Sequence, residues 1–214
     1  HIEVDDMHAL RESCRACVAI GASGSFNARA QFGGKELSDV VINGLTANMA
    51  EIDTRTVDSG RYFSPVEEEH GSQVCVIGQK LVDELFPGRN PIGSTIRLAQ
   101  QEFKVVGTFE RIGSVLGQEQ DLFAVIPLTV FMRMRGSRTS LTLNVQVSGA
   151  AGAMETAQDE ARLTLRARRH LVGNQTDDFY FGTKDSYMEL WTSISGAFFA
   201  VFMLFSTIVD YWSA

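Results

Sequence analysis

An uncharged run near the C-terminus constrains this chain more than any other feature. Residues 190–209 include no charged side chain. A helix of that length spans roughly 30 Å, the thickness of the hydrocarbon core of a bilayer. Trp191 lies at one end, and Tyr211 and Trp212 follow the other, where aromatic rings favour the membrane interfaces. We therefore expect 186–209 to be the start of a transmembrane helix; a buried C-terminal core helix is the alternative.

The body before this run is long enough to bury a sizeable core. It begins at His1, with no leader or earlier hydrophobic span, so we interpret the chain as a fragment of a longer protein. Its net charge is −7, from 26 acidic and 19 basic residues. This balance disfavours a nucleic-acid-binding surface, because phosphate recognition needs clustered excess positive charge.

One basic cluster closes a helical pattern that opens with acidic residues. The cluster comprises Arg166, Arg168, Arg169 and His170, and the acids are Glu155, Asp159 and Glu160. Acids at the start of a helix and bases at its end complement the helix dipole. The pattern therefore favours helix stabilisation over an anion-binding site.

Three cysteines are too few for a disulfide framework. Cys14 and Cys17 form a C-x-x-C, but zinc would need a second ligand pair, and the histidines offer no matching spacing. A redox motif should follow a strand and open a helix, whereas this one closes a predicted helix. We expect incidental thiols at Cys14 and Cys17, and a core position for Cys75.

Hydrophobic periodicity predicts the local structure of the body. Helices are expected at 7–14, 46–52, 79–86, 129–135 and 151–171, and strands at 16–32, 35–45, 73–77, 94–99, 102–112, 122–128, 141–147 and 177–183. The first two strands should form a hairpin through Gly33-Gly34. Asp5-Asp6 should cap the first helix, and the acidic run 67–69 reads as solvated surface.

The order of these elements predicts an α+β fold with two lobes. The ends of the body alternate strands and helices, whereas its middle is mostly short strands with Gly and Pro turns. We expect a membrane-proximal α/β lobe from 1–57 and 137–185, an inserted β-rich lobe at 58–136, and then the transmembrane segment. No Gly or Pro lies between Lys184 and Ser195, so the last helix should leave the body without a flexible linker.

The sequence carries no complete catalytic constellation. GASGSF fails as a nucleophile elbow because Ser25 stands where the second Gly belongs. No phosphate-binding G-x-x-x-x-G-K-[ST] and no H-E-x-x-H is present. We therefore predict that the chain is not an enzyme, with no catalytic, cofactor-binding or metal-binding residues and no cofactor.

Residues 60–107 resemble the extracytoplasmic (periplasmic core) domain of MacB/FtsX-type ABC transporter permeases. That family shows a GR-x-F, a strand ending in Gly, a helix ending in Leu-Phe, a P-[IL]-G and a strand ending F-x-V-V-G. The matching residues are Gly60-Arg61-Phe63, Gly78, Leu85-Phe86, Pro91-Ile92-Gly93 and Phe103 with Val105-Val106-Gly107. These are folding residues: Gly78 and Gly93 suit tight turns with positive φ, and Arg61 can pair with an acid.

The resemblance implies a domain outside the bacterial inner (cytoplasmic) membrane, on its periplasmic or extracellular side. It would couple ATP hydrolysis in the cytoplasm to export or to mechanotransmission. Implied partners are an ATP-binding cassette subunit or domain, a second permease copy, the membrane and a periplasmic adaptor or substrate protein, but no nucleic acid. The alternatives are a ligand-sensing ectodomain of a membrane receptor, which would show an apolar pocket with converging polar groups, and a secreted redox protein that uses Cys14 and Cys17.

Overall fold

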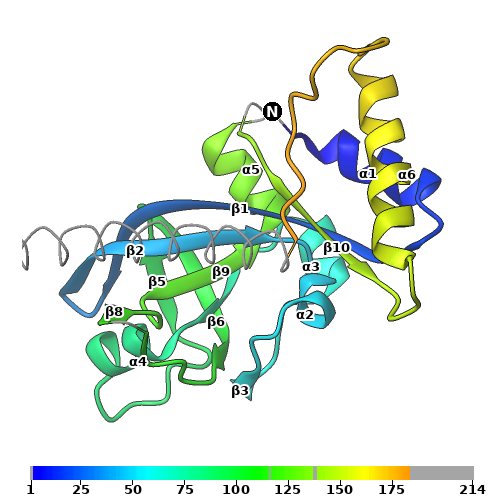
Figure 1. Ribbon diagram of the computed structural model, residues 1–214. Coiled ribbons are helices and arrows are strands. Elements are labelled where there is room, and N and C mark those ends of the chain that lie inside the picture. Colours follow the sequence, from blue (N-terminus) through cyan, green and yellow to red (C-terminus); the bar gives the residue numbers. More distant parts are fainter. Residues whose placement is uncertain (1, 116, 137–138, 184–214) are drawn as a thin grey trace, which may run out of the picture. The chain divides into compact units, whose positions relative to one another are not determined.

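The fold is built around one long β-hairpin. The computed structural model describes residues 2–115, 117–136 and 139–183. In it, β1 (Cys17–Phe32) pairs antiparallel with β2 (Lys35–Leu45), and Gly33-Gly34 form the turn between them (Figure 1). The predicted hairpin is confirmed. The elements described below lie in residues 1–176, which form one compact unit; the chain from Asp177 onward forms a second.

Within the described residues, one sheet runs in the order β10-β1-β2-β9-β4-β6-β3. Its other members are β3 (Val57–Gly60), β4 (Val74–Ile77), β5 (Thr95–Leu98), β6 (Gln101–Phe109), β9 (Phe123–Pro127) and β10 (Thr142–Val147). β2 runs parallel to β9 and β4 parallel to β6, while the other pairs are antiparallel. β5 pairs with both β1 and β6, so the strands β1-β2-β9-β4-β6-β5 close into a ring. A short ribbon, β7 (Ser114–Val115) with β8 (Gln118–Glu119), stands apart.

The ring combines strands from both ranges that were expected as lobes. β1 and β2 belong to 1–57, whereas β4, β5, β6 and β9 belong to 58–136. β1 pairs with β10 over its first half and with β5 near its end. The division into two lobes, 1–57 with 137–185 and 58–136, stays a prediction. Strands from both ranges belong to one mixed sheet.

Short helices cover the sheet. They are α2 (Met49–Ile52), α3 (Pro65–Glu69), α4 (Gln79–Leu85) and α5 (Leu128–Arg135). α4 buries Leu81 and Leu85, as its apolar spacing predicts. Phe131 of α5 lies over Gly24 of β1 and Gly44 of β2, where no side chain stands in its way. A further cluster gathers the ends of β2, β4, β6 and β9: Leu45, Ala47, Met49, Phe63, Val74, Val76, Val106, Phe109, Phe123 and Val125.

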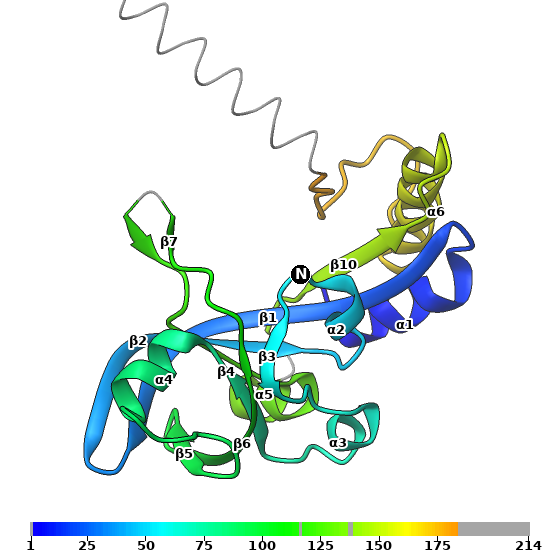
Figure 2. The same ribbon diagram turned by 90° about the horizontal axis from the view of Figure 1, so that it is seen from below.

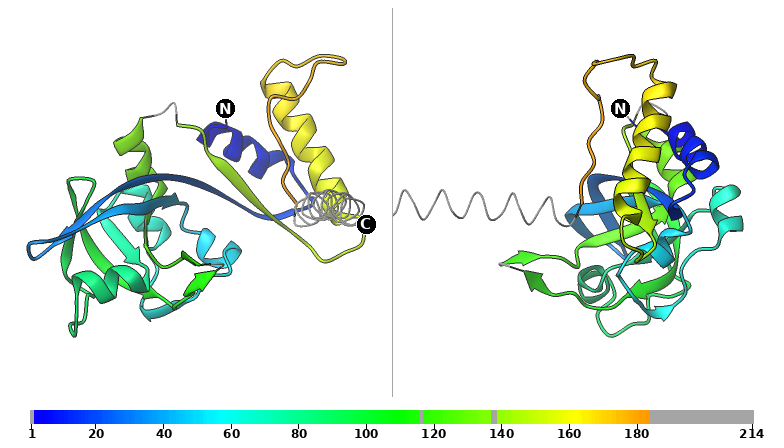
Figure 3. Two further views of the ribbon diagram at one scale, coloured as in Figure 1. Left: turned by 60° about the vertical axis from the view of Figure 1, so that its left-hand side comes forward. Right: turned by 45° about the vertical axis from the view of Figure 1, so that its right-hand side comes forward.

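The first and last helices pack together at one end of this unit. α1 (Val4–Ser13) and α6 (Ala153–Arg168) lie side by side in every view (Figures 1, 2 and 3). α6 buries Ala157, Ala161 and Leu165, which share one face of the helix at a spacing of four residues, while Met154 is exposed. The turn of the β1–β2 hairpin lies at the opposite end of the same unit (Figure 3).

Several local predictions need correction. Residues 177–183 form no strand, because alternation is only a local signal and a strand also needs a ladder of hydrogen bonds to a partner strand, which these residues do not form. Glu3, not Asp5, is the N-cap of α1, and Asp6 completes a capping box with it. Gly78 has φ −75°, so a tight turn does not explain it; a side chain there would instead collide with the Asp121 carbonyl and Phe123. Gly93, at φ +86°, behaves as predicted.

Across residues 2–115, 117–136 and 139–183, no helix combines the length and apolar character needed to cross a membrane. The predicted transmembrane segment 186–209 lies outside the described residues.

Candidate functional site: the helix seam and the distal pocket

A buried carboxylate joins the two terminal helices. Asp6 of α1 accepts hydrogen bonds from Arg168 Nε at 2.9 Å and from Arg169 Nη2 at 3.2 Å. Its side chain is 9% exposed. Burial by itself raises the pKa of Asp6, but the bonds from Arg168, the Glu3 amide and Arg169 outweigh burial, so the pKa lies below its usual value. The contacts between α1 and α6, from this ion pair to the loop 13–16, form what we call the helix seam.

The other end of the helix seam is made by the loop between α1 and β1. The amides of Arg15 and Ala16 both donate to Glu160 Oε2 of α6, at 2.8 and 3.0 Å. One turn along α6, Thr164 shares a 2.7 Å hydrogen bond with Ser13. The helix seam is therefore fixed by polar contacts at both ends, around an apolar middle.

A disulfide between Cys14 and Cys17 closes this loop, which corrects the prediction of incidental thiols. Cys14 is the C-cap of α1 and Cys17 is the first residue of β1, so the reversal of the chain brings their Cα atoms to 5.5 Å. That separation is typical of disulfides. The sequence analysis weighed the two cysteines only as a zinc or redox motif and missed a structural disulfide that joins the end of a helix to the start of a strand. Cys75 is fully buried, as predicted.

The basic cluster at the end of α6 bonds to groups beyond the helix. Arg166 donates to the carbonyls of Gly173 and Gln175, which follow the helix. Arg168 and Arg169 bond to Asp6 in α1. The predicted stabilisation of the helix by this cluster stays a prediction, and the tertiary role of Arg168 and Arg169 was not visible in the sequence.

β1 connects the helix seam to the far end of the unit. Arg11 of α1 donates through Nε and Nη2 to the Ile20 carbonyl of β1, at 3.0 and 2.7 Å. From there β1 continues to Phe32 without a break. A strand of this length spans on the order of 50 Å. Two packed helices and a surface far from them are thus joined by one continuous strand.

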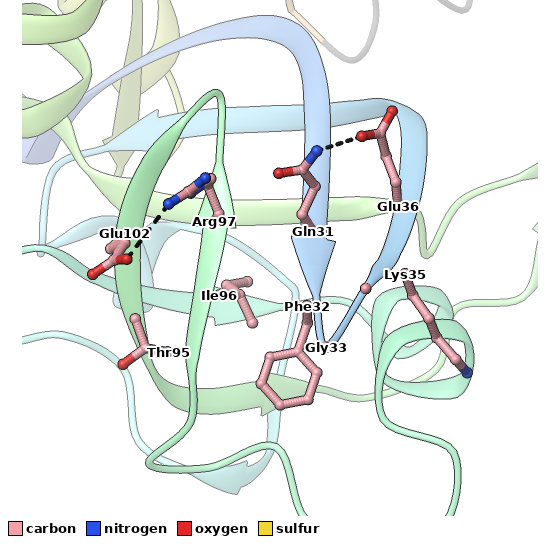
Figure 4. Close-up of a pocket in the computed structure, with 10 residues that line it drawn as sticks. Gln31, Phe32, Gly33, Lys35, Glu36, Thr95, Ile96, Arg97 and Glu102 are labelled. Atoms are coloured by element: carbon pink, nitrogen blue, oxygen red, sulfur yellow. Dashed lines mark hydrogen bonds and ion pairs between the residues drawn. The ribbon is translucent and has the colours of Figure 1, made fainter.

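At that far end lies a hollow of about 450 Å³, which we call the distal pocket (Figure 4). Phe32 and Ile96 form its apolar part, and the Phe32 ring also packs against the Phe86 ring, tilted by 33°, with ring centroids 4.1 Å apart. Polar pairs border it: Gln31 donates to Glu36, and Arg97 Nη2 lies 3.7 Å from Glu102 Oε1. An open hollow with an apolar floor and paired charges at its rim suits contact with another molecule rather than chemistry.

A second cavity, of about 660 Å³, lies between α1, α3 and α5. Met7, Leu128 and Met132 provide apolar lining, and Arg11 and Glu68 provide charge. Glu68 Oε2 accepts the Ala47 amide at 2.7 Å. Burial raises the pKa of Glu68, against the bond from Ala47 and the charge of Arg11. Sequence reasoning missed this cavity, because its walls come from three helices far apart in the chain.

Arg61, in the motif GR-x-F, has the structural role that the sequence allowed for it. Its Nη1 and Nη2 donate to the two carboxylate oxygens of Glu67, at 2.7 and 2.8 Å. Glu67 also completes a capping box with Ser64 at the start of α3. The Arg61 bond holds the pKa of Glu67 at about 2. The acidic run 67–69 is therefore not plain solvated surface, since Glu67 and Glu68 are half-buried and bonded.

Among the described residues, no group of three or more His, Cys, Asp and Glu side chains is arranged to hold a metal ion. The expectation of no catalytic, cofactor-binding or metal-binding residue stays a prediction.

The chain is similar to known proteins over most of its length. The family described as MacB-like periplasmic core domain matches residues 2–163. The macrolide export ATP-binding/permease protein MacB of Syntrophobacter fumaroxidans is 31% identical over 156 residues, which cover 72% of this chain and 22% of that protein. The MacB protein of Bdellovibrio bacteriovorus is 26% identical over 179 residues, covering 83% and 27%. The chain thus spans about a quarter of the length of these curated relatives.

Solved structures show the same fold. The periplasmic region of MacB from Actinobacillus actinomycetemcomitans superposes with a TM-score of 0.75 at 16% identity, covering 90% of this chain and 83% of that one. The extracellular domain of the noncanonic ABC-type transporter YknZ from Gram-positive bacteria gives 0.68 at 18% identity, covering 79% and 84%. At these identities the likeness is one of fold.

Proposed function

Because the chain belongs to the MacB-like periplasmic core domain family, and is the periplasmic domain of a MacB-like ABC transporter permease, we propose that it transmits motion. In this proposal, ATP hydrolysis in the cytoplasm moves membrane helices, and the domain carries that movement to the periplasmic side for export or mechanotransmission. The ATPase resides on a separate subunit or domain, and this domain is non-catalytic.

The helix seam carries the proposal. α1 begins the described chain and α6 is its last helix, and Asp6 with Arg168 and Arg169 fastens one to the other. Arg11 then ties α1 to β1, which reaches the distal pocket. A displacement entering at either terminal helix would move both helices and the hairpin as one body, because packed elements with fixed contacts shift together rather than deform.

The proposed partners follow from this role. They are an ATP-binding cassette subunit or domain, a second permease copy, the membrane, and a periplasmic adaptor or substrate protein at the distal end. We place the domain on the periplasmic side of the bacterial inner membrane. The helix expected from Ser186 onward would deliver the movement.

An insertion in the full-length permease tests the proposal. Gly-Gly-Ser-Gly placed after Tyr187 should leave expression and folding intact but abolish transport or partner activation, while ATP hydrolysis continues. The matched control is the same insertion after Gly88, in an exposed turn where an added side-chain carbon would meet nothing within 4 Å; it should leave transport unchanged. If transport survives the first insertion at normal expression, the domain is a docking platform rather than a transmitter.

The cavity between α1, α3 and α5 supports a second candidate, the ligand-sensing ectodomain. It combines apolar walls with the half-buried Glu68, as such a site requires. Thermal-shift measurements with a panel of small amphipathic molecules test it. A ligand that raises the Tm of the parent but not that of Met132→Lys would favour the sensing function. If no molecule in the panel behaves in this way, the sensing function is rejected.

A further inference from the structure

The long strand β1 has a free edge in its middle. On the side away from β2, β10 pairs with β1 only as far as Ser23, and β5 pairs only at Ala30 and Gln31. Among the described residues, no strand pairs with Gly24 to Ala28 along this edge. Five residues of open edge offer room for an added strand of about 17 Å.

Main-chain groups on this edge point outward. The Thr46 amide donates to the Ala22 carbonyl, so the main chain of Ala22 faces β2. Successive residues of a strand alternate in direction, so Ser25 and Asn27 direct their N–H and C=O groups to the open side. The Arg29 carbonyl, on the same side, accepts the Ala99 amide at 3.0 Å, which confirms the alternation. Ser25 and Asn27 are both exposed.

A cavity with positively charged lining residues lies beside the free edge of β1. A cavity of about 330 Å³ lies there, lined by Phe26, Asn27, Ala28, Arg29, Gln31, Ala99, Gln100 and Arg135. This lining contains two arginines and no acidic side chain, although the whole chain has a net charge of −7. Arg135 lies 5.0 Å from the Phe26 ring, and Arg29, paired with Glu36, is 70% exposed.

We propose that the β1 edge from Gly24 to Ala28 is a docking site for an extended acidic segment of a partner protein, which adds to the sheet as a strand. The main-chain groups of Ser25 and Asn27 would supply the ladder bonds, as in other cases of strand addition. Arg135 would select acidic side chains, since Arg29 is already paired with Glu36. The inference does not depend on motion transmission, since a static domain could bind a partner in this way.

Synthetic peptides test the proposal on the 214-residue chain. The probe is acetyl-Asp-Val-Glu-Val-Asp-Val-amide. One comparison peptide has lysine in place of each acidic residue. The other is the acidic peptide with N-methyl groups on alternate residues, so it cannot form the main-chain hydrogen bonds of an added strand. Binding is followed by the NMR shifts of the chain's own amides. The acidic probe should shift Ser25 and Asn27 saturably, and both comparison peptides should bind at least about tenfold more weakly.

Variants of the arginine complete the test. Arg135→Ala should weaken the acidic probe by about two- to fivefold, since the ion pair is exposed. Arg135→Lys, which keeps the charge, should restore most of the affinity, and Arg89→Ala, in the turn after α4, should have no effect. Equal binding of the N-methylated peptide, shifts confined to other strands, or no saturable binding at millimolar peptide would overturn the proposal. The exposed arginines would then serve to prevent this strand edge from pairing with another chain.

Discussion

Asp6 Oδ2 and Arg169 Nη2 lie 3.2 Å apart although the two residues are 163 positions apart in the sequence. Both side chains are largely buried, at 9% and 12% exposure, so water does little to screen the pair. This contact and its neighbour from Arg168 close the helix seam, and much of the proposed function rests on them.

Asp6→Asn should destabilise the chain by about 2–3 kcal/mol, because it removes the buried negative charge that accepts hydrogen bonds from both Arg168 and Arg169. Urea unfolding followed by circular dichroism measures the loss. Asp5→Asn is the matched control: Asp5 is exposed on the same helical turn, so its change should stay within about 0.5 kcal/mol. Equal effects of the two variants would show that the helix seam contributes no stability through this pair.

The Arg61–Glu67 pair should make part of the stability depend on pH. The folded pKa of Glu67, about 2, lies below its ordinary value of 4.5. Such a depressed pKa contributes stability above pH 4.5 that is lost as the pH falls toward about 2. The stability difference between the parent and Glu67→Gln should therefore shrink over that window, while Glu69→Gln, at an exposed position, shows no such trend. The measurement would run from about pH 6 to about pH 2. A stability difference between the parent and Glu67→Gln that stays constant over this range would contradict a lowered pKa of Glu67.

The Cys14–Cys17 disulfide should stabilise the fold by about 2 kcal/mol, the chain-entropy value for so short a loop. The double variant Cys14→Ser/Cys17→Ser should lose this amount, and dithiothreitol should cause a similar loss in the parent but none in the variant. Alkylation under denaturing, non-reducing conditions provides the direct assay. It should label Cys75 alone; labelling of all three cysteines would show that the disulfide is absent.

Gly44→Ala should destabilise the chain by about 1–3 kcal/mol, because the added methyl group would collide with Phe131 where α5 packs on β2. Gly149→Ala is the control, since nothing lies within 4 Å of the position of its new methyl group and its φ is not positive. Thermal unfolding of both variants decides the matter. A Gly44→Ala variant as stable as the control would mean that α5 is not seated as described.

The local elements were predicted well because each has its own signal in the chain. Alternation and a Gly-Gly turn indicate the hairpin, and apolar spacing places Leu81 and Leu85 inside. The motif around Arg61 and Gly93 identified the family that the comparisons confirm. The same reasoning failed for 177–183, where alternation without a partner strand gives no sheet.

Local patterns in the chain were therefore enough to predict most helices, most strands and the family, but not α3, whose acidic residues were interpreted as solvated surface. The closing of the ring by β5 and β1, and the contact of Asp6 with Arg168 and Arg169, became visible only in three dimensions. The open edge that β1 keeps between β10 and β5 became visible there as well. Charge pairing, strand pairing and burial depend on distances in space, and residues far apart in the sequence carry no local record of which partner they will meet.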